Sequence, residues 1–228
     1  MNHKSSETIY STHHTNFIDK ILVKKRFEMI EVINQFLNKK DLNDVLDVGT
    51  TSDDQNPSSN ILIKNLKNFK TYNSISDQKI TSNFFNKILQ KSITDDFTDD
   101  EIKQYSSDLV ISNATIEHVG NYENQKKMIE NIIKFSNKFF IIITPNRFHP
   151  LEFHTKIPFF HWLPKKIHRK LLSLLNFEAL AKEENLNLMS KKEINLILKK
   201  FTNITYELKG IKFLLFKSNF IIIGKKTS

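Results

Sequence analysis

The sequence predicts an α/β fold with a largely parallel sheet that closes with an antiparallel pair of strands. Short apolar runs of strand length alternate with helical segments between residues 16 and 144, which is typical of βαβ units. Two of these runs, Asp44–Thr50 and Asp108–Val119, contain strands that stop abruptly at small or polar residues, as strands do at the ligand-binding edge of an open sheet. Two more runs, Ile204–Leu208 and Phe213–Ile223, follow each other without a helix between them.

The first predicted elements are a long helix and the strand that it leads into. Apolar residues recur at helical spacing from Asn16 to Leu37. The strand Asp44–Val48 follows, and the loop Gly49–Ser59 is rich in Thr, Ser, Asp and Asn. Pro57, near the end of this loop, favours the first turn of a helix that carries the apolar residues of 61–66.

The middle of the chain supplies the other parallel strands. The acidic stretch Thr94–Glu101 is predicted to be a surface loop, and an amphipathic helix spans Glu123–Asn137. Pro145 ends the fifth strand. The predicted strands two to five are Phe69–Ile75, Phe85–Ile93, Leu109–Ser112 and Phe139–Thr144.

The stretch from Asn146 to Leu188 breaks the alternation, because it is rich in Pro, His and aromatic residues. A helix then begins at Ser190-Lys-Lys-Glu193, a capping-box pattern, and runs to about Phe201. The two final strands are expected to be joined by a turn near Lys209-Gly210.

Composition indicates one globular domain that uses no cysteine chemistry. The chain has 228 residues, of which 39% are hydrophobic and 26% charged. Without cysteine it has no disulfides, no thiolate metal ligands and no Cys nucleophile. Residues 1–14 are polar and are predicted to form a mobile arm. No secretory signal or membrane-spanning run is visible, so a cytoplasmic location is expected.

The net charge of +9 raises the question of a nucleic-acid partner. The basic residues are nearly all lysines spread along the chain, which argues against one. The dense basic patch is Lys165–Lys170. An alternative hypothesis is therefore a non-enzymatic protein that binds RNA or a membrane surface through this patch. A transient contact with a membrane surface is also compatible with an enzyme.

The sequence resembles the class I S-adenosylmethionine-dependent methyltransferases, in particular the methyltransferase type 11 group. The resemblance extends from about Asp44 to the C-terminus. It rests on Val45-Leu-Asp-Val-Gly49, on Asp108–Val119 and on Ile143-Thr-Pro-Asn146. It implies a Rossmann-like, seven-stranded, mostly parallel sheet with helices on both faces and a C-terminal antiparallel hairpin. Residues 15–228 would form one methyltransferase domain, in which an insertion at about 146–188 covers the substrate.

The resemblance also implies residues that bind S-adenosylmethionine. A glycine after the first strand lets the cofactor approach the backbone. The family usually has two or three glycines here, whereas this chain has Gly49 followed by hydroxyl residues and an acid. The Asp77 carboxylate would accept hydrogen bonds from the ribose hydroxyls. Ser92, Asp95 and Asp96 are candidates for the contact with the adenine amino group. The cofactor-binding residues implied are Asp47, Gly49, Thr50, Asp77, Ser92, Asn113 and Ala114.

Methyl transfer from a sulfonium depends mainly on positioning, and a base is needed only to remove a proton from an oxygen or nitrogen acceptor. The candidate bases are His118, His149, Glu152 and His154. In quinone O-methyltransferases with a similar Glu-His-Val segment, the residues matching Glu117 and His118 help bind a divalent metal with a carboxylate three residues earlier. That position is Ala114 here, so no metal ligands are assigned, and a purely structural role for Glu117 and His118 stays open.

The expected acceptor is a small molecule, a sugar or a lipid-linked intermediate, methylated on oxygen or nitrogen. An RNA methyltransferase is disfavoured because no Asn-Pro-Pro-Tyr-like motif follows the fourth strand. A nicotinamide oxidoreductase is disfavoured because Gly-x-Gly-x-x-Gly is missing after the first strand.

Overall fold

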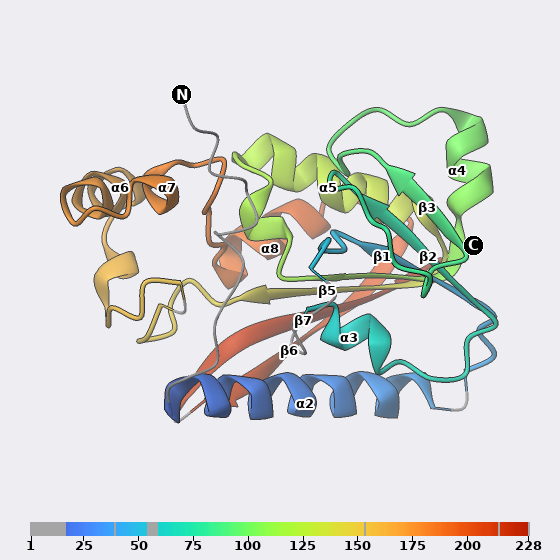
Figure 1. Ribbon diagram of the computed structural model, residues 1–228, viewed down its shortest axis with the longest axis horizontal. Coiled ribbons are helices and arrows are strands. Elements are labelled where there is room, and N and C mark those ends of the chain that lie inside the picture. The colour runs from blue at the N-terminus through green and yellow to red at the C-terminus, as the bar shows by residue number, and fades with distance from the viewer. Residues whose placement is uncertain (1–16, 39, 54–58, 153, 214, 228) are drawn as a thin grey trace.

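The computed structural model describes residues 17–38, 40–53, 59–152, 154–213 and 215–227. The predicted N-terminal arm and Pro57 lie outside these residues. Seven strands form one sheet in the order β3-β2-β1-β4-β5-β7-β6, in which β7 runs antiparallel to both of its neighbours (Figure 1). The predicted sheet and its closing hairpin are confirmed. The strands are β1 Asp44–Val48, β2 Thr71–Ser76, β3 Lys87–Gln90, β4 Ser107–Asn113, β5 Ser136–Pro145, β6 Ile204–Phe213 and β7 Phe216–Lys226.

The central strand β1 brings three strand ends to one edge of the sheet. Val48, its last residue, lies beside Ile75 of β2 and Ser112 of β4. The loops that follow these three strands therefore begin side by side, at the place where open α/β sheets bind ligands.

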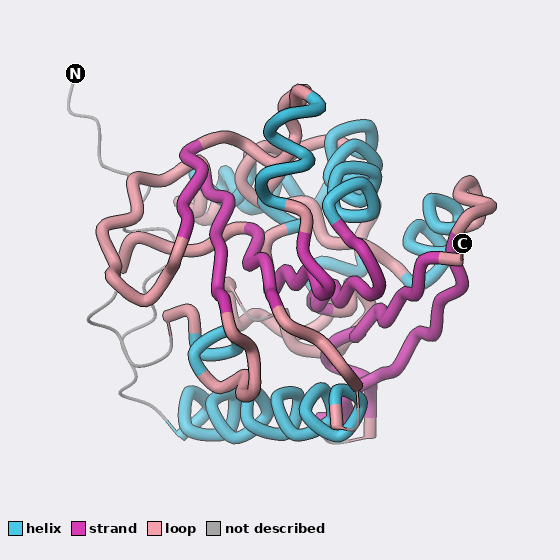
Figure 2. Tube along the Cα trace, turned by 90° about the vertical axis from the view of Figure 1, so that its right-hand side faces the viewer, coloured by secondary structure: helices cyan, strands magenta, loops and turns pink. Residues whose placement is uncertain are grey.

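Helices cover both faces of the sheet. On one face lie α2 Phe17–Leu37 and α3 Ile61–Lys64, and on the other lie α4 Asp99–Tyr105, α5 Tyr122–Phe135 and α8 Lys191–Leu198. Figure 2 shows the twisted strands between α2 and the opposite helices. Two apolar cores result, one on each face. They form because the strands are apolar on both faces, as parallel strands buried between helices are.

Two local predictions are wrong, and both errors have a physical reason. The predicted loop 94–101 contains the start of α4, because Thr98 and Glu101 form a capping box of the same kind that correctly predicted α8. The predicted turn at Lys209-Gly210 lies inside β6, which continues to Phe213. Gly210 pairs with Phe220 of β7, so it continues the strand and does not form a turn.

The segment 146–188 leaves the sheet at the end of β5 and returns to the same place. Asn146 and Met189 form a parallel bridge, and the Arg147 amide donates to the Met189 carbonyl oxygen at 3.2 Å. Between these ends lie η2 Phe160–Trp162, α6 Lys165–Leu174 and α7 Glu178–Ala181. Helices α6 and α7 project from the body of the molecule at one end (Figure 1). Among the described helices, none has the length and apolar character needed to cross a bilayer.

Candidate active site

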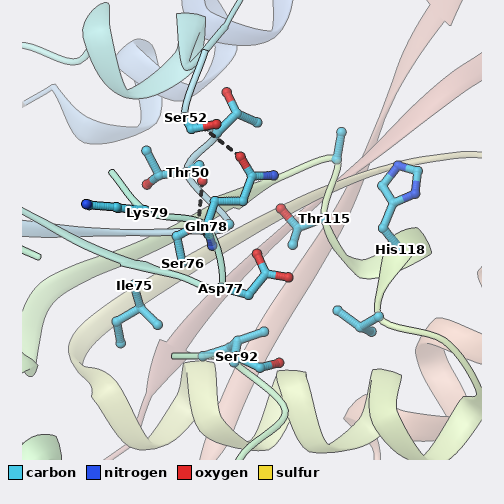
Figure 3. Close-up of a pocket in the computed structure, with 15 residues that line it drawn as sticks. Thr50, Ser52, Ile75, Ser76, Asp77, Gln78, Lys79, Ser92, Thr115 and His118 are labelled. Atoms are coloured by element: carbon cyan, nitrogen blue, oxygen red, sulfur yellow. Dashed lines mark hydrogen bonds between the residues drawn. The ribbon is translucent and has the colours of Figure 1, made fainter. Parts of the chain in front are cut away.

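A cavity of about 350 Å³ lies at the carboxyl edge of the sheet, a volume in the range of small-molecule sites. Its lining comes from the loops after β1, β2, β3 and β4. Figure 3 shows the side chain of Asp77 near the centre of this cavity, with Thr115 and His118 on one side and Ser92 on another. The lining residues used below are Gly49, Thr50, Ser52, Asp77, Gln78, Ser92, Ala114, Thr115 and His118.

Side-chain hydrogen bonds hold the loop after β1 in place. The Thr50 hydroxyl donates to the buried Asp47 carboxylate at 2.6 Å and accepts from Ser74 at 2.8 Å. Ser76 donates to the Thr50 carbonyl oxygen at 2.6 Å, and the Ser52 amide donates to the Gln78 side chain at 2.8 Å. Burial raises the pKa of Asp47 to about 6, against the opposing effect of the Thr50 hydrogen bond. The loop is thus bonded to β2 and the residues after it through hydroxyls, a backbone carbonyl oxygen and a side-chain amide oxygen.

Two backbone positions at the cavity edge are conformationally special. Gly49 has φ of +88°, and a Cβ atom at this position would collide with the side chain of Thr115. Ala114, directly after β4, has φ of +54°, an uncommon value for a residue with a side chain. The turns after β1 and β4 therefore pack against each other closely, and each turn takes a left-handed residue to do so.

A largely buried cluster borders the cavity through His118; it consists of the fully buried Glu117 and the partly buried His118 and His154. The ligand-type atoms of the three side chains all lie within 4.8 Å of one another. Glu117 is fully buried, and Thr144 donates to its Oε2 at 3.2 Å, whereas its Oε1 has no hydrogen-bond partner among the described residues. Burial raises the pKa of Glu117 to about 7. An orphaned buried carboxylate oxygen is costly, and a cation or a proton would satisfy it.

The two imidazoles of this cluster are oriented from outside it. Nδ1 of His118 lies 2.5 Å from the carbonyl oxygen of Asn185, so Nδ1 carries the proton and Nε2 the lone pair. Burial lowers the pKa of His118 to about 4, with a further contribution from His154. Nδ1 of His154 lies 2.6 Å from the Glu152 carboxylate.

Glu152 is buried and accepts from three donors. Its oxygens accept from Nδ1 and the backbone amide of His154, at 2.6 and 2.9 Å, and from the Thr155 amide at 2.6 Å. Burial alone would raise the pKa of Glu152, but these hydrogen bonds bring it down to about 2. Burial would likewise lower the pKa of His154, but Glu152 raises it above its usual value. The pair therefore favours a carboxylate beside a protonated imidazole.

Comparison with known proteins identifies the architecture around this site. No protein-family model matches the chain, and no curated protein sequence matches it significantly. Solved structures do match it, among them magnesium protoporphyrin IX methyltransferase (ChlM) from Synechocystis PCC 6803 with bound SAH. That match has a TM-score of 0.57 and 12% identity, over 97% of this chain and 92% of the other.

Two further matches have the same character. The N-methyltransferase NodS from Bradyrhizobium japonicum WM9 gives a TM-score of 0.54 at 9% identity, over 92% of this chain and 99% of the other. The methyltransferase domain of bacterial CtHen1-C gives 0.57 at 12% identity, over 90% and 100%. The chain has the class I S-adenosylmethionine-dependent methyltransferase fold.

Within this methyltransferase fold, the residues predicted to bind the cofactor divide into two groups. Gly49, Thr50, Asp77, Ser92 and Ala114 line the cavity. The other two, Asp47 and Asn113, do not line it. Asp47 lies beneath Thr50, and the Asn113 carbonyl oxygen lies 3.4 Å from the Thr115 hydroxyl.

The three adenine candidates are also separated. Ser92 lines the cavity, whereas the carboxylate of Asp95 accepts from the Ser92 amide at 3.2 Å. Asp96 is paired with Lys127 at 2.6 Å on the surface.

The four candidate bases do not form one group either. His118 and His154 lie together, with ring centroids 5.3 Å apart, and Glu152 orients His154. The fourth, His149, is buried elsewhere. Its ring packs against Phe213, and its carbonyl oxygen accepts from His161 at 2.7 Å. His149 therefore holds the 146–164 region together.

Sequence reasoning missed Thr115, Gln78 and the role of Glu117 beside His154. Thr115 could have been expected, because it directly follows the small residues that end β4. The Glu117–His154 contact has no local signal, since 37 positions of sequence separate the two residues and only the return of the loop after β5 joins them.

Proposed function

We propose that this chain is an S-adenosylmethionine-dependent methyltransferase with a small-molecule, sugar or lipid-linked acceptor. The observation that carries the proposal is the cavity at the carboxyl edge of β1, β2 and β4, with the carboxylate of Asp77 at its centre. A carboxylate after the second strand is suited to accept two neighbouring ribose hydroxyls. Magnesium protoporphyrin IX methyltransferase, which has the same fold, was solved in one structure with bound SAM and in another with bound SAH.

The cofactor would lie across the ends of β1 and β4. Its ribose would meet Asp77, its adenine would meet Ser92 and Ile93, and its methionine end would lie against Gly49 and Ala114. The methyl group would then face His118, which lines the cavity and belongs to the buried cluster. The acceptor would then lie on the side of the cavity that His118 shares with His154 of the segment 146–188.

The buried cluster supports activation of the acceptor by a divalent cation. Glu117, His118 and His154 would hold the ion, and Glu152, Asn185 and Thr144 would orient these three ligands, as outer partners do in metal sites. A bound cation would lower the pKa of an acceptor hydroxyl or polarise its oxygen. Cation binding would release the proton from Nε2 of His154, while Nδ1 would keep its proton and its hydrogen bond to Glu152.

The first experiment is titration calorimetry with S-adenosylhomocysteine. Asp77→Asn is expected to weaken binding about 10- to 100-fold, because hydrogen bonds to a charged group contribute about 1.5–3 kcal/mol. Asp96→Asn is the matched control, since Asp96 is an exposed carboxylate outside the cavity. Gly49→Arg is expected to abolish binding. If the folded wild-type protein does not bind millimolar S-adenosylhomocysteine, the proposal fails.

A further inference from the structure

The exposed apolar side chains of the molecule are concentrated in and just before α6. Among the described residues, eleven large hydrophobic side chains are exposed, and five of them fall within residues 159–175. A single exposed leucine is ordinary, but a group of this density on one segment marks an interaction site. The five are Phe159, Trp162, Ile167, Leu174 and Leu175, with exposures of 40–70%.

Helix α6 has a buried side and a separate exposed apolar side. His168 and Leu172, four positions apart, are buried against the rest of the segment. Ile167 and Leu174, seven positions apart, share another side and are 50% and 70% exposed. The buried side, with His168 and Leu172, attaches α6 to the rest of the protein. The exposed apolar side has no such role within the described part of the chain.

The charges on α6 divide in the same way. Lys165 pairs with Glu193 at 3.0 Å, and Arg169 pairs with Glu183 at 2.7 Å. Lys166 and Lys170 are exposed beside Ile167 and Leu174, and neither forms an ion pair with a described residue. The helix contains no acidic residue. Its outward side therefore combines aliphatic side chains with two positive charges that the protein does not neutralise.

The position of α6 makes this side accessible. Helices α6 and α7 form the projection at one end of the molecule, and α5 and α8 lie nearer to the sheet (Figure 1). In the turn before α6, Trp162 is fixed by a hydrogen bond from its indole N–H to the His149 carbonyl oxygen at 3.2 Å, and its ring lies 5.0 Å from Phe159. These two aromatic side chains are thus exposed and do not belong to the core.

We propose that α6 and the turn before it dock on the surface of a bilayer that contains anionic lipids. A short helix with aliphatic residues beside lysines, preceded by Trp and Phe, is the composition of interfacial helices. The aliphatic side chains would enter the acyl boundary, and Lys166 and Lys170 would meet anionic headgroups. A nucleic acid would leave Ile167, Leu174 and Leu175 in water, so the observations favour a bilayer. This inference goes beyond the proposed function and does not depend on it.

The test is cosedimentation of the full chain with vesicles of phosphatidylcholine, with and without 30 mol% phosphatidylglycerol (about one lipid in three). We expect binding to the anionic vesicles, with weaker binding to the neutral ones and in high salt. Lys166→Gln with Lys170→Gln should weaken binding about 25-fold, roughly fivefold for each lysine. Ile167→Ser with Leu174→Ser should weaken it at least tenfold on both vesicle types.

Matched controls lie on α8. Lys191→Gln with Lys192→Gln removes two exposed lysines, and Leu196→Ser removes a leucine that is 50% exposed. Both are expected to bind vesicles like the wild type. Circular dichroism and S-adenosylhomocysteine binding, measured on every variant, separate loss of folding or of the cofactor site from loss of docking.

Three results would overturn the proposal. One is absence of wild-type binding to anionic vesicles, and another is unchanged vesicle binding by both α6 variants. The third is evidence for a different partner in place of vesicles. It would be either a single-stranded RNA oligonucleotide bound through Lys166 and Lys170, or a dimer in light scattering that Ile167→Ser with Leu174→Ser dissociates.

Discussion

The contact between the turns after β1 and β4 can be tested by substituting Gly49. In Gly49→Ala the alanine must keep a left-handed backbone conformation, with φ of +88°, and its methyl group collides with Thr115. The backbone conformation costs about 1–2 kcal/mol, and the collision adds about 1–3 kcal/mol of overpacking. We therefore expect Gly49→Ala to lower the free energy of unfolding by roughly 2–5 kcal/mol.

The two contributions can be separated by a double-mutant cycle with Thr115→Ala, measured by urea denaturation. Thr115→Ala alone should cost little, because its hydroxyl is 3.4 Å from each of its two carbonyl acceptors. It removes the two side-chain atoms nearest to the new methyl group, so the double variant should regain about 1–3 kcal/mol. A coupling energy below about 0.5 kcal/mol would show that the turns do not pack as described.

Three further predictions concern the charged groups. Asp47→Asn should stabilise the protein by about 3 kcal/mol at pH 8, with no difference below pH 3.8. Because the pKa of Asp47 is about 6 in the folded state, ionisation of its buried carboxyl destabilises the fold as the pH rises from 3.8 to above 6. A stability difference in urea denaturation that does not change with pH would contradict this prediction. Wild-type protein should bind Mn²⁺ in calorimetry, and Glu117→Gln should abolish that binding, whereas retained affinity would remove Glu117 from the ligands. Glu152→Gln should weaken Mn²⁺ binding about 10- to 100-fold through His154, with exposed Glu123→Gln as the unaffected control.

The parts of the fold that could be predicted are those with a local signal. The seven strands and the helices α2, α5 and α8 have apolar periods or caps that can be read within one turn or strand. Helix α4 carried a cap too, in Thr98 and Glu101, but its acidic composition concealed it. The prediction at Gly210 was wrong because glycine occurs both in turns and within strands, and only the pairing with Phe220 on β7 decides between them.

The site follows the same rule. Residues directly after strands, such as Asp77 and Ala114, could be placed at the cavity from sequence. The buried cluster could not, because Glu117 and His154 meet only through the path of the loop after β5. Likewise, the orientation of His118 depends on the carbonyl oxygen of Asn185, and a carbonyl group has no sequence signature.

The bridge between Asn146 and Met189 has a consequence for how such a protein diversifies. Because a backbone hydrogen bond joins the two ends of the excursion, its projecting part, α6 and α7, starts and ends near a fixed junction with the sheet. Loop-closure entropy changes only slowly with length, so residues 165–181, which carry α6 and α7 but none of the cluster residues, could change in length or sequence at small cost to the strands. Surface recognition by this projection can therefore change during evolution, while Glu152, His154 and Asn185 and the cavity at Gly49 and Asp77 stay in place.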